Sequence, residues 1–151
     1  MPQYQIFALP VAGGVLALSP LPQGDAVQDL LDWRPDLVVS MTGQEEMDRL
    51  GAGDLGAVLR AAGVAWHHLP VVDYGTPASP DVTVIEGAAL ATLRAGGKVL
   101  THCRGGCGRS GMMALRLMIA AGEDPDVALT RLRALRPCAV ETDAQFAWAK
   151  G

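Results

Sequence analysis

A cysteine and an arginine, Cys103 and Arg109, are separated by five residues in the segment HCRGGCGRSG, residues 102–111. A thiolate is a nucleophile, and the planar guanidinium group of arginine can bind two oxygens of a phosphate group. The segment lies between the apolar runs VLT and MMALRLMIAA, which is typical of a loop that joins a strand to a helix. The spacing therefore predicts a nucleophile and an oxyanion-binding group in one loop.

The backbone of this loop is predicted to bind an anion. N–H groups at the start of a helix converge on one point and favour negative charge there. Glycines allow the backbone to curl without side-chain clashes. The same field lowers the pKa of a thiol from about 8.5 to roughly 3.5–7.5, so we expect Cys103 to be a thiolate. The predicted phosphate-binding residues are Arg104, Gly105, Gly106, Cys107, Gly108 and Arg109.

Two nucleotide-binding motifs are alternative interpretations of the same segment. Gly106, Gly108 and Gly111 match G-x-G-x-x-G. A dinucleotide-binding fold needs a second strand that ends in an acid about 20 residues further on, whereas that region reads EDPDVALTRLRALR, which is helical. The P-loop motif fails because no lysine precedes Ser110 and Cys103 stands where its first glycine is required.

The segment HCRGGCGRSG resembles the signature His-Cys-x-x-Gly-x-x-Arg-Ser/Thr of cysteine-dependent protein tyrosine and dual-specificity phosphatases. Three more segments resemble successive parts of the kinase-associated phosphatase (cyclin-dependent kinase inhibitor 3) group and of related small microbial phosphatases. These segments are LALSPLP (residues 16–22), HHLPVVDYGTPASPD (67–81) and RPCAVETDAQ (136–145). The likeness covers most of the chain and keeps the order of the segments.

The resemblance implies a role for each residue of the signature. Cys103 would attack phosphorus and form a phosphocysteine, while Arg109 and the amides of residues 104–109 would hold the phosphoryl oxygens. Ser110 would donate a hydrogen bond to the Cys103 sulfur and help it leave in the second step. His102 is expected to shape the loop and to support the thiolate without acting as a base.

The leaving oxygen needs a proton, so a carboxylic acid must reach over the pocket. Asp73 is the preferred candidate, because it lies 30 residues before Cys103 in a loop rich in Gly and Pro, and the matching loop of the resembled group places its acid there. Asp81 is the rival candidate, but its position in a Ser-Pro-Asp helix start is enough to explain an aspartate there. Tyr74 either lines the mouth of the pocket or packs against the domain.

Hydrolysis of a phosphocysteine also needs a positioned water molecule. Gln145, in the segment ETDAQ, resembles the glutamine that positions this water in related phosphatases. The alternative is an exposed amide on a terminal helix.

The chain has three cysteines, an odd number without the spacing of a disulfide framework. This points to a reducing compartment, and we expect a cytoplasmic protein. The phosphatase interpretation does not require Cys107, which we expect to pack as a small apolar side chain. The alternative hypothesis is that mild peroxide links it to Cys103 through a sulfenic acid. Cys138 could form such a disulfide with Cys103 less readily.

Composition and charge exclude several other classes of protein. The 151 residues fit one domain, residues 1–151, and with half of them hydrophobic and 19% charged the chain is globular rather than disordered. The net charge of −4, without a long basic run, argues against binding to nucleic acid. The apolar segment IFALPVAGGVLALSPL, residues 6–21, has no basic flank and is interrupted by Pro10. We therefore expect neither a signal peptide nor a membrane span.

His67 and His68 could suggest a metal site. Adjacent residues of a strand face opposite sides, so the two imidazoles cannot readily bind one ion together. No second ligand pair has the spacing of a metal site. We predict no metal and no other cofactor.

Strands alternate with helices along the chain, which predicts a single α/β domain with a central, mostly parallel sheet flanked by helices. Two strands are predicted within residues 6–21, joined by a Gly13-Gly14 turn, and a helix is predicted to begin with Ser79 as its N-cap and Pro80 at its first position. The other predicted strands are residues 36–41, 64–71 and 98–102. The predicted helices are residues 24–33, 45–50, 54–63, 79–96, 108–122, 125–137 and 142–150.

The sequence thus predicts a small phosphatase that hydrolyses phosphate monoesters on phosphotyrosine, with phosphoserine and phosphothreonine as further substrates. Its partner would be a phosphorylated protein or peptide, with no nucleic acid and no membrane involved. The alternatives are a non-catalytic phosphoprotein-binding module and a related cysteine-loop enzyme, a sulfurtransferase or an arsenate reductase. The sequence does not fix the oligomeric state.

Overall fold

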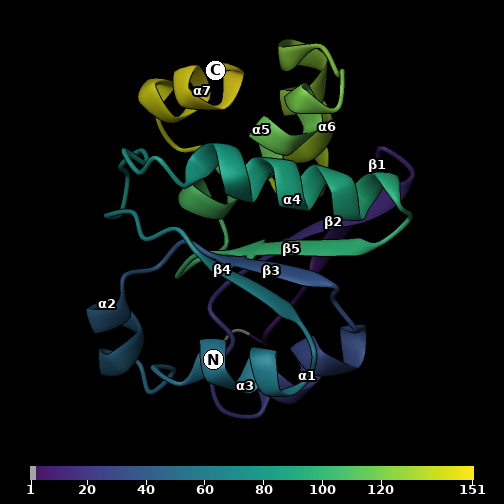
Figure 1. Ribbon diagram of the computed structural model, residues 1–151. Coiled ribbons are helices and arrows are strands. Elements are labelled where there is room, and N and C mark those ends of the chain that lie inside the picture. Colours follow the sequence, from purple (N-terminus) through teal and green to yellow (C-terminus); the bar gives the residue numbers. More distant parts are fainter. Residues whose placement is uncertain (1–2) are drawn as a thin grey trace.

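A computed structural model describes residues 3–151 of the protein. Five strands form one sheet in the order β1-β2-β5-β3-β4 (Figure 1). β1 pairs antiparallel with β2, and all the other neighbours in the sheet are parallel, as the sequence predicted. The strands are β1 (Phe7–Val11), β2 (Gly14–Ser19), β3 (Leu37–Ser40), β4 (Ala65–His68) and β5 (Lys98–His102).

Helices cover both faces of the sheet (Figure 1). One face carries α1 (Ala26–Trp33), α2 (Gln44–Arg49) and α3 (Leu55–Ala61). The other carries α4 (Val82–Arg94), α5 (Gly108–Ala120), α6 (Pro125–Leu135) and α7 (Asp143–Lys150). Each face has its own apolar core, and residues of the central strands alternate between the two. The apolar runs of the strands follow from this burial on both faces.

β5 and α5 place the loop that carries the signature. β5 lies at the centre of the sheet, between β2 and β3, so its carboxyl end opens between two neighbouring parallel strands. Ligands of open α/β sheets bind at this end of the strands. α5 follows directly and is buried almost all round, which fixes its N-terminus against the sheet.

Two predicted boundaries are wrong by a few residues. The hairpin turn is formed by Ala12 and Gly13, both with positive φ (53° and 92°), because Gly14 already pairs with Val11 as the first residue of β2. α4 begins at Val82 rather than next to Ser79. The Ser79 hydroxyl accepts the N–H of Asp81 (3.1 Å) and closes a turn before the helix begins.

Within residues 3–151, none of the helices combines the length and the apolar character that crossing a bilayer requires.

Candidate active site

Cys103 follows β5 directly and is almost fully buried, with 3% of its surface exposed. Its Sγ lies 3.3 Å from the Oγ of Ser110, which belongs to the first turn of α5. The two residues are therefore in hydrogen-bond contact, as the resemblance implied. The thiol of Cys103 is free.

The loop between Cys103 and α5 turns its carbonyl groups outward. The carbonyls of four consecutive residues, 104–107, accept hydrogen bonds from other parts of the chain or from α5. The donors are Leu21 N to Arg104 (3.1 Å), Arg136 Nη2 to Gly105 (3.0 Å), Arg136 Nε to Gly106 (3.1 Å), and Gly111 N (2.8 Å) and Val140 N (3.4 Å) to Cys107. A trans peptide directs its N–H opposite to its carbonyl, so the amides of residues 105–108 point away from these partners. This arrangement leaves the four amides available to an anion.

Gly106 is the loop residue whose backbone needs glycine. Its φ is +75°, and a Cβ there would lie 2.6 Å from the backbone nitrogen of Pro20. Gly105 and Gly108 do not have positive φ, but a Cβ at Gly108 would clash with the carboxylate of Glu141, whereas the space at Gly105 is open. Residues 19–21 thus press against one side of the loop.

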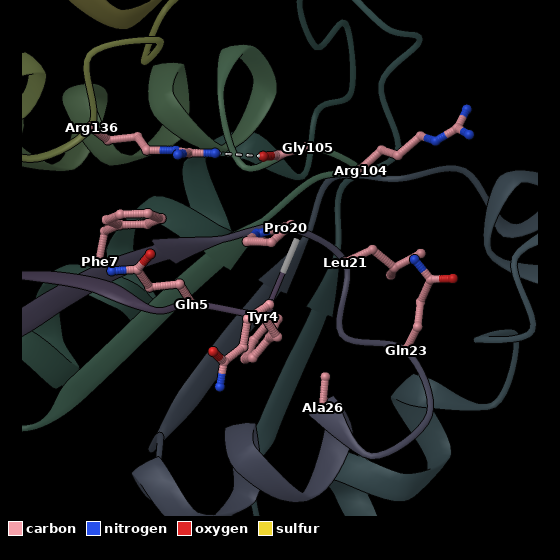
Figure 2. A pocket seen from close by; sticks show the side chains of 11 residues that line it. Tyr4, Gln5, Phe7, Pro20, Leu21, Gln23, Ala26, Arg104, Gly105 and Arg136 are labelled. Carbon is pink, nitrogen blue, oxygen red and sulfur yellow. Dashed lines mark hydrogen bonds between the residues drawn. The ribbon is translucent and has the colours of Figure 1, made fainter. Parts of the chain in front are cut away.

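Figure 2 shows the loop beside Pro20 and Leu21, where the guanidinium group of Arg136 is directed at the carbonyl of Gly105. The Arg104 side chain extends away from this point, and it is exposed. A cavity of about 570 Å³ lies in front of these residues and is bordered by Tyr4 and Leu21. Arg104 and Gly105 therefore belong to the phosphate loop and also border this cavity.

Arg109 is buried, with 1% of its side chain exposed, and it is held by a carboxylate that the sequence did not single out. Glu46 of α2 accepts from Nη1 (2.9 Å) and from Nη2 (3.0 Å), and the Val71 carbonyl also accepts from Nη1 (2.9 Å). The hydrogen bond from Arg109 lowers the pKa of Glu46, although burial opposes this. Burial lowers the pKa of Arg109, but the bond to Glu46 and the negative charge at Cys103 raise it overall. The guanidinium group therefore stays charged and fixed.

Asp73 lies next to the remaining nitrogen of Arg109. Its Oδ1 is 3.8 Å from Nε, and its side chain is 59% exposed. Within residues 3–151, the Nε atom of Arg109 has no hydrogen-bond partner. The rival, Asp81, is the N-cap residue of α4 and is not among the ionic contacts of Arg109. Tyr74 is 62% exposed and does not pack against the domain.

His102 is fully buried and belongs to a hydrogen-bonded relay. Trp66 Nε1 donates to Ser40 Oγ (2.8 Å), and Ser40 Oγ is 2.5 Å from His102 Nε2. The indole N–H can only donate, so the Ser40 hydroxyl has its own proton for Nε2. Nδ1 then carries the ring proton and faces the carbonyl of Cys103 (3.3 Å). Burial lowers the pKa of His102 to about 4, so the ring supports the loop as a neutral donor, without a positive charge.

Gln145 is fully buried, so the alternative of an exposed amide is wrong. Its Oε1 accepts the N–H of Glu141 (2.8 Å), and its Nε2 donates to the carbonyl of Gly75 (3.3 Å), two residues after Asp73. The side chain therefore links the loop of the candidate acid to the segment before α7. The Thr142 hydroxyl caps this helix by accepting the N–H of Gln145 (3.0 Å).

Cys107 is joined to Cys138 by a disulfide, with 5.1 Å between the two Cα atoms. The expectation that Cys107 is a small packing side chain is therefore wrong, and in this state its sulfur is not available for the alternative, a peroxide-induced bond to Cys103. The two half-cystines are 31 residues apart in the chain, and their pairing depends on the path of α6, which the spacing of the cysteines does not reveal.

His67 and His68 lie on β4. His68 stacks on Trp66, with 5.2 Å between the ring centroids, and its Nε2 contacts the Thr42 carbonyl (2.6 Å). Among residues 3–151, no three His, Cys, Asp or Glu side chains lie together in a way that could hold a metal ion.

Comparison with known proteins agrees with this geometry. The family model described as "PTP-SAK: Swiss Army Knife protein, DSP-PTPase phosphatase domain" matches residues 11–148. Cyclin-dependent kinase inhibitor 3 of Homo sapiens is 31% identical over 104 residues, which are 67% of this chain and 49% of that protein. The protein of the same name from Rattus norvegicus is 30% identical over 104 residues, again 67% of this chain and 49% of that protein. The chain thus spans about half the length of the curated relatives it matches.

Solved structures share the fold. A crystal structure of kinase associated phosphatase, with its catalytic-site cysteine replaced by serine, superposes with a TM-score of 0.86 at 23% identity, covering 99% of this chain and 93% of that one. The crystal structure of Tk-PTP in its active form gives a TM-score of 0.73 at 30% identity, covering 95% and 94%. From the family match over residues 11–148, supported by the shared fold, the chain belongs to the dual-specificity and protein tyrosine phosphatase (DSP-PTPase) domain family.

Proposed function

We propose that this chain hydrolyses phosphate monoesters through a phosphocysteine at Cys103. The observation that carries the proposal is the position of Arg109 between the phosphate loop and the candidate acid. Its Nε has no hydrogen-bond partner within residues 3–151 and lies 3.8 Å from Asp73. A buried N–H without a partner is costly, and a phosphoryl oxygen would provide one.

In the first step, the Cys103 thiolate attacks phosphorus and the ester oxygen leaves. The amides of residues 105–108 and the guanidinium group of Arg109 bind the three remaining oxygens, where charge develops. Asp73, protonated, gives its proton to the leaving oxygen, so the alcohol or phenol departs neutral.

In the second step, water attacks the phosphocysteine and the sulfur leaves as a thiolate. Ser110, whose Oγ lies 3.3 Å from the sulfur, stabilises the negative charge on it. Asp73, now ionised, accepts the proton of the water, and phosphate is released. Gln145, from its place beside the acid loop, orients the water.

The proposed substrates are phosphotyrosine residues of proteins, with phosphoserine and phosphothreonine as further substrates. Val72 and Tyr74, on either side of Asp73, are 80% and 62% exposed and offer an apolar surface to an aromatic leaving group. The family match favours a phosphatase over a sulfurtransferase or an arsenate reductase. Two relatives bear names that refer to kinases, cyclin-dependent kinase inhibitor 3 and kinase associated phosphatase, which supports a phosphoprotein partner.

Turnover of p-nitrophenyl phosphate and of a phosphotyrosine peptide tests the proposal. Cys103→Ser should abolish turnover and retain binding of phosphate. Asp73→Asn should lower kcat about 100-fold with little change in KM, because it removes the proton donor. Asp81→Asn is the matched control and should leave kcat unchanged.

Two results would contradict the mechanism. Turnover that survives Cys103→Ser would exclude the phosphocysteine, and equal losses from Asp73→Asn and Asp81→Asn would exclude Asp73 as the acid. If the unaltered protein binds phosphate and a phosphopeptide without turnover, the domain is a binding module.

A further inference from the structure

The disulfide between Cys107 and Cys138 ties the phosphate loop to the segment that follows α6. Cys107 is the N-cap residue of α5, and its neighbours in the loop supply the inward-facing amides. Cys138 stands between Arg136 and Val140, which both donate hydrogen bonds to the same loop. The covalent bond is thus at the centre of a brace formed by residues 136–140.

The noncovalent part of this brace is weak at Cys107 itself. The bond from Val140 N to the Cys107 carbonyl is long (3.4 Å), and the contact from Arg136 Nη2 to the Cys107 sulfur is 3.7 Å. Arg136 holds the carbonyls of Gly105 and Gly106 more closely, at 3.0 and 3.1 Å. The disulfide is therefore the strongest link that this segment makes to Cys107.

Exposure separates this pair of cysteines from the proposed nucleophile. Cys107 and Cys138 are both half-buried and thus partly open to a reductant, whereas Cys103 is 3% exposed at the base of the loop. A dithiol can therefore act on the bridge while Cys103, which is already a thiol, stays unchanged.

We propose that the Cys107–Cys138 disulfide is a redox-sensitive positioning element of the phosphate site, and that its reduction by a dithiol weakens phosphate binding. The proposal rests on the proposed function, because it assumes that the loop binds phosphate. An anion site needs several amides to converge at once, and preorganisation of the loop sets its affinity. Without the bridge, residues 136–140 hold Cys107 and the amide of Gly108 only through the long hydrogen bond from Val140 and the weak contact from Arg136.

The redox step is a thiol–disulfide exchange. One thiolate of the dithiol attacks a bridge sulfur, the bond between Cys107 and Cys138 breaks, and a mixed disulfide forms. The second thiol of the reductant displaces the protein sulfur and closes an intramolecular disulfide in the reductant. Two electrons and two protons pass from the dithiol to the protein, which leaves thiols at Cys107 and Cys138.

The test uses the Cys103→Ser variant of the full chain, because it has only the two bridge cysteines and cannot undergo oxidation at the nucleophile. A thiol assay counts free thiols before and after treatment with dithiothreitol, which is then removed under anaerobic conditions. Isothermal titration calorimetry with tungstate, a phosphate mimic, measures Kd in both states. We expect no free thiols and tight binding before reduction, and two free thiols with Kd raised about fivefold afterwards.

Cys103→Ser combined with Cys138→Ser is the matched control. It should bind tungstate like the reduced protein and should not respond to dithiothreitol. Circular dichroism should give the same helix content for the oxidised and reduced forms, so that weaker binding reports on the loop and not on unfolding.

The outcomes are distinguishable. Equal Kd values in the two states would overturn the proposed redox role. So would two free thiols that are present before reduction and persist after exposure to oxidised glutathione. Neither result would contradict the proposed function. Absence of tungstate binding in both states would overturn the proposed function and this inference with it.

Discussion

Ser40 Oγ lies 2.5 Å from His102 Nε2, in the buried interior behind the candidate nucleophile. A carbonyl can only accept, so the carbonyl beside Nδ1 selects the tautomer in which His102 donates from Nδ1, and the Ser40 hydroxyl, which already accepts the indole N–H of Trp66, donates to Nε2. That donor faces the carbonyl of Cys103 (3.3 Å). The orientation of the peptide that carries Cys103 thus depends on two side chains from β3 and β4, outside the signature.

Breaking this relay should slow the proposed reaction. Trp66→Phe keeps an aromatic side chain, though a smaller one, and removes one hydrogen bond, and we expect kcat/KM to fall about fivefold, the equivalent of ~1 kcal/mol. Ser40→Ala should cost more, because it leaves two buried nitrogens without a partner. The rate of Cys103 alkylation by iodoacetamide should change in both variants. Trp33→Phe, another half-buried tryptophan, is the control, and equal effects at Trp33 and Trp66 would argue against the relay.

Removing the charge of Glu46 should release Arg109. Glu46→Gln keeps the shape but loses one acceptor of the bidentate pair, so the guanidinium group can turn from its position. We expect the inhibition constant of phosphate to rise about tenfold, the equivalent of ~1.4 kcal/mol. Glu45→Gln, an exposed neighbour on the same helix, should change nothing. Unchanged inhibition in Glu46→Gln would show that Arg109 is held well enough by Val71.

Gln145→Ala tests whether this amide acts in the second step. If Gln145 orients the water, the phosphocysteine should accumulate, and rapid mixing with p-nitrophenyl phosphate should show a burst of product before a slower steady state. A role confined to holding Gly75 would instead slow the first step, give no burst and lower Tm. The size of the burst decides between the two.

Stability should fall in mild acid. Burial lowers the pKa of His102 to about 4 in the folded chain, against an ordinary value of 6.5. Between pH 6.5 and pH 4, the unfolded chain therefore binds a proton at His102 that the folded chain does not bind. The stabilisation is complete above pH 6.5 and is lost as pH falls from 6.5 to 4, by about 3 kcal/mol. The hydrogen bond from Arg109 lowers the pKa of Glu46, which adds a further loss below its ordinary value of 4.5.

Urea unfolding measured across this pH range checks the prediction. His102→Gln should flatten the dependence between pH 6.5 and pH 4, and His67→Gln should retain it. A flat profile in the unaltered protein would contradict the assignment of a neutral, buried His102.

The sequence predicted the sheet, the helices and the signature loop because each has a local cause. Apolar runs indicate strands buried on both faces, and Cys103, Arg109 and Ser110 are close together in the chain. Glu46 could not be distinguished from Glu45, because both stand in the same acidic helix start and only the packing of α2 brings one of them to Arg109. The bridge from Cys107 to Cys138 likewise depends on where α6 ends relative to the loop. Contacts between distant segments leave no periodic signal.

The two sides of the phosphate loop are supported by opposite parts of the chain, by Leu21 on one side and by Val140 on the other. During synthesis, β5 and the loop leave the ribosome well before residue 140. At that stage the hydrogen bond from Leu21 can form, but the one from Val140 cannot. Domains fold largely as units once their sequence is complete. Nascent chains that stop short of residue 140 should therefore contain every residue of the signature and still fail to bind phosphate.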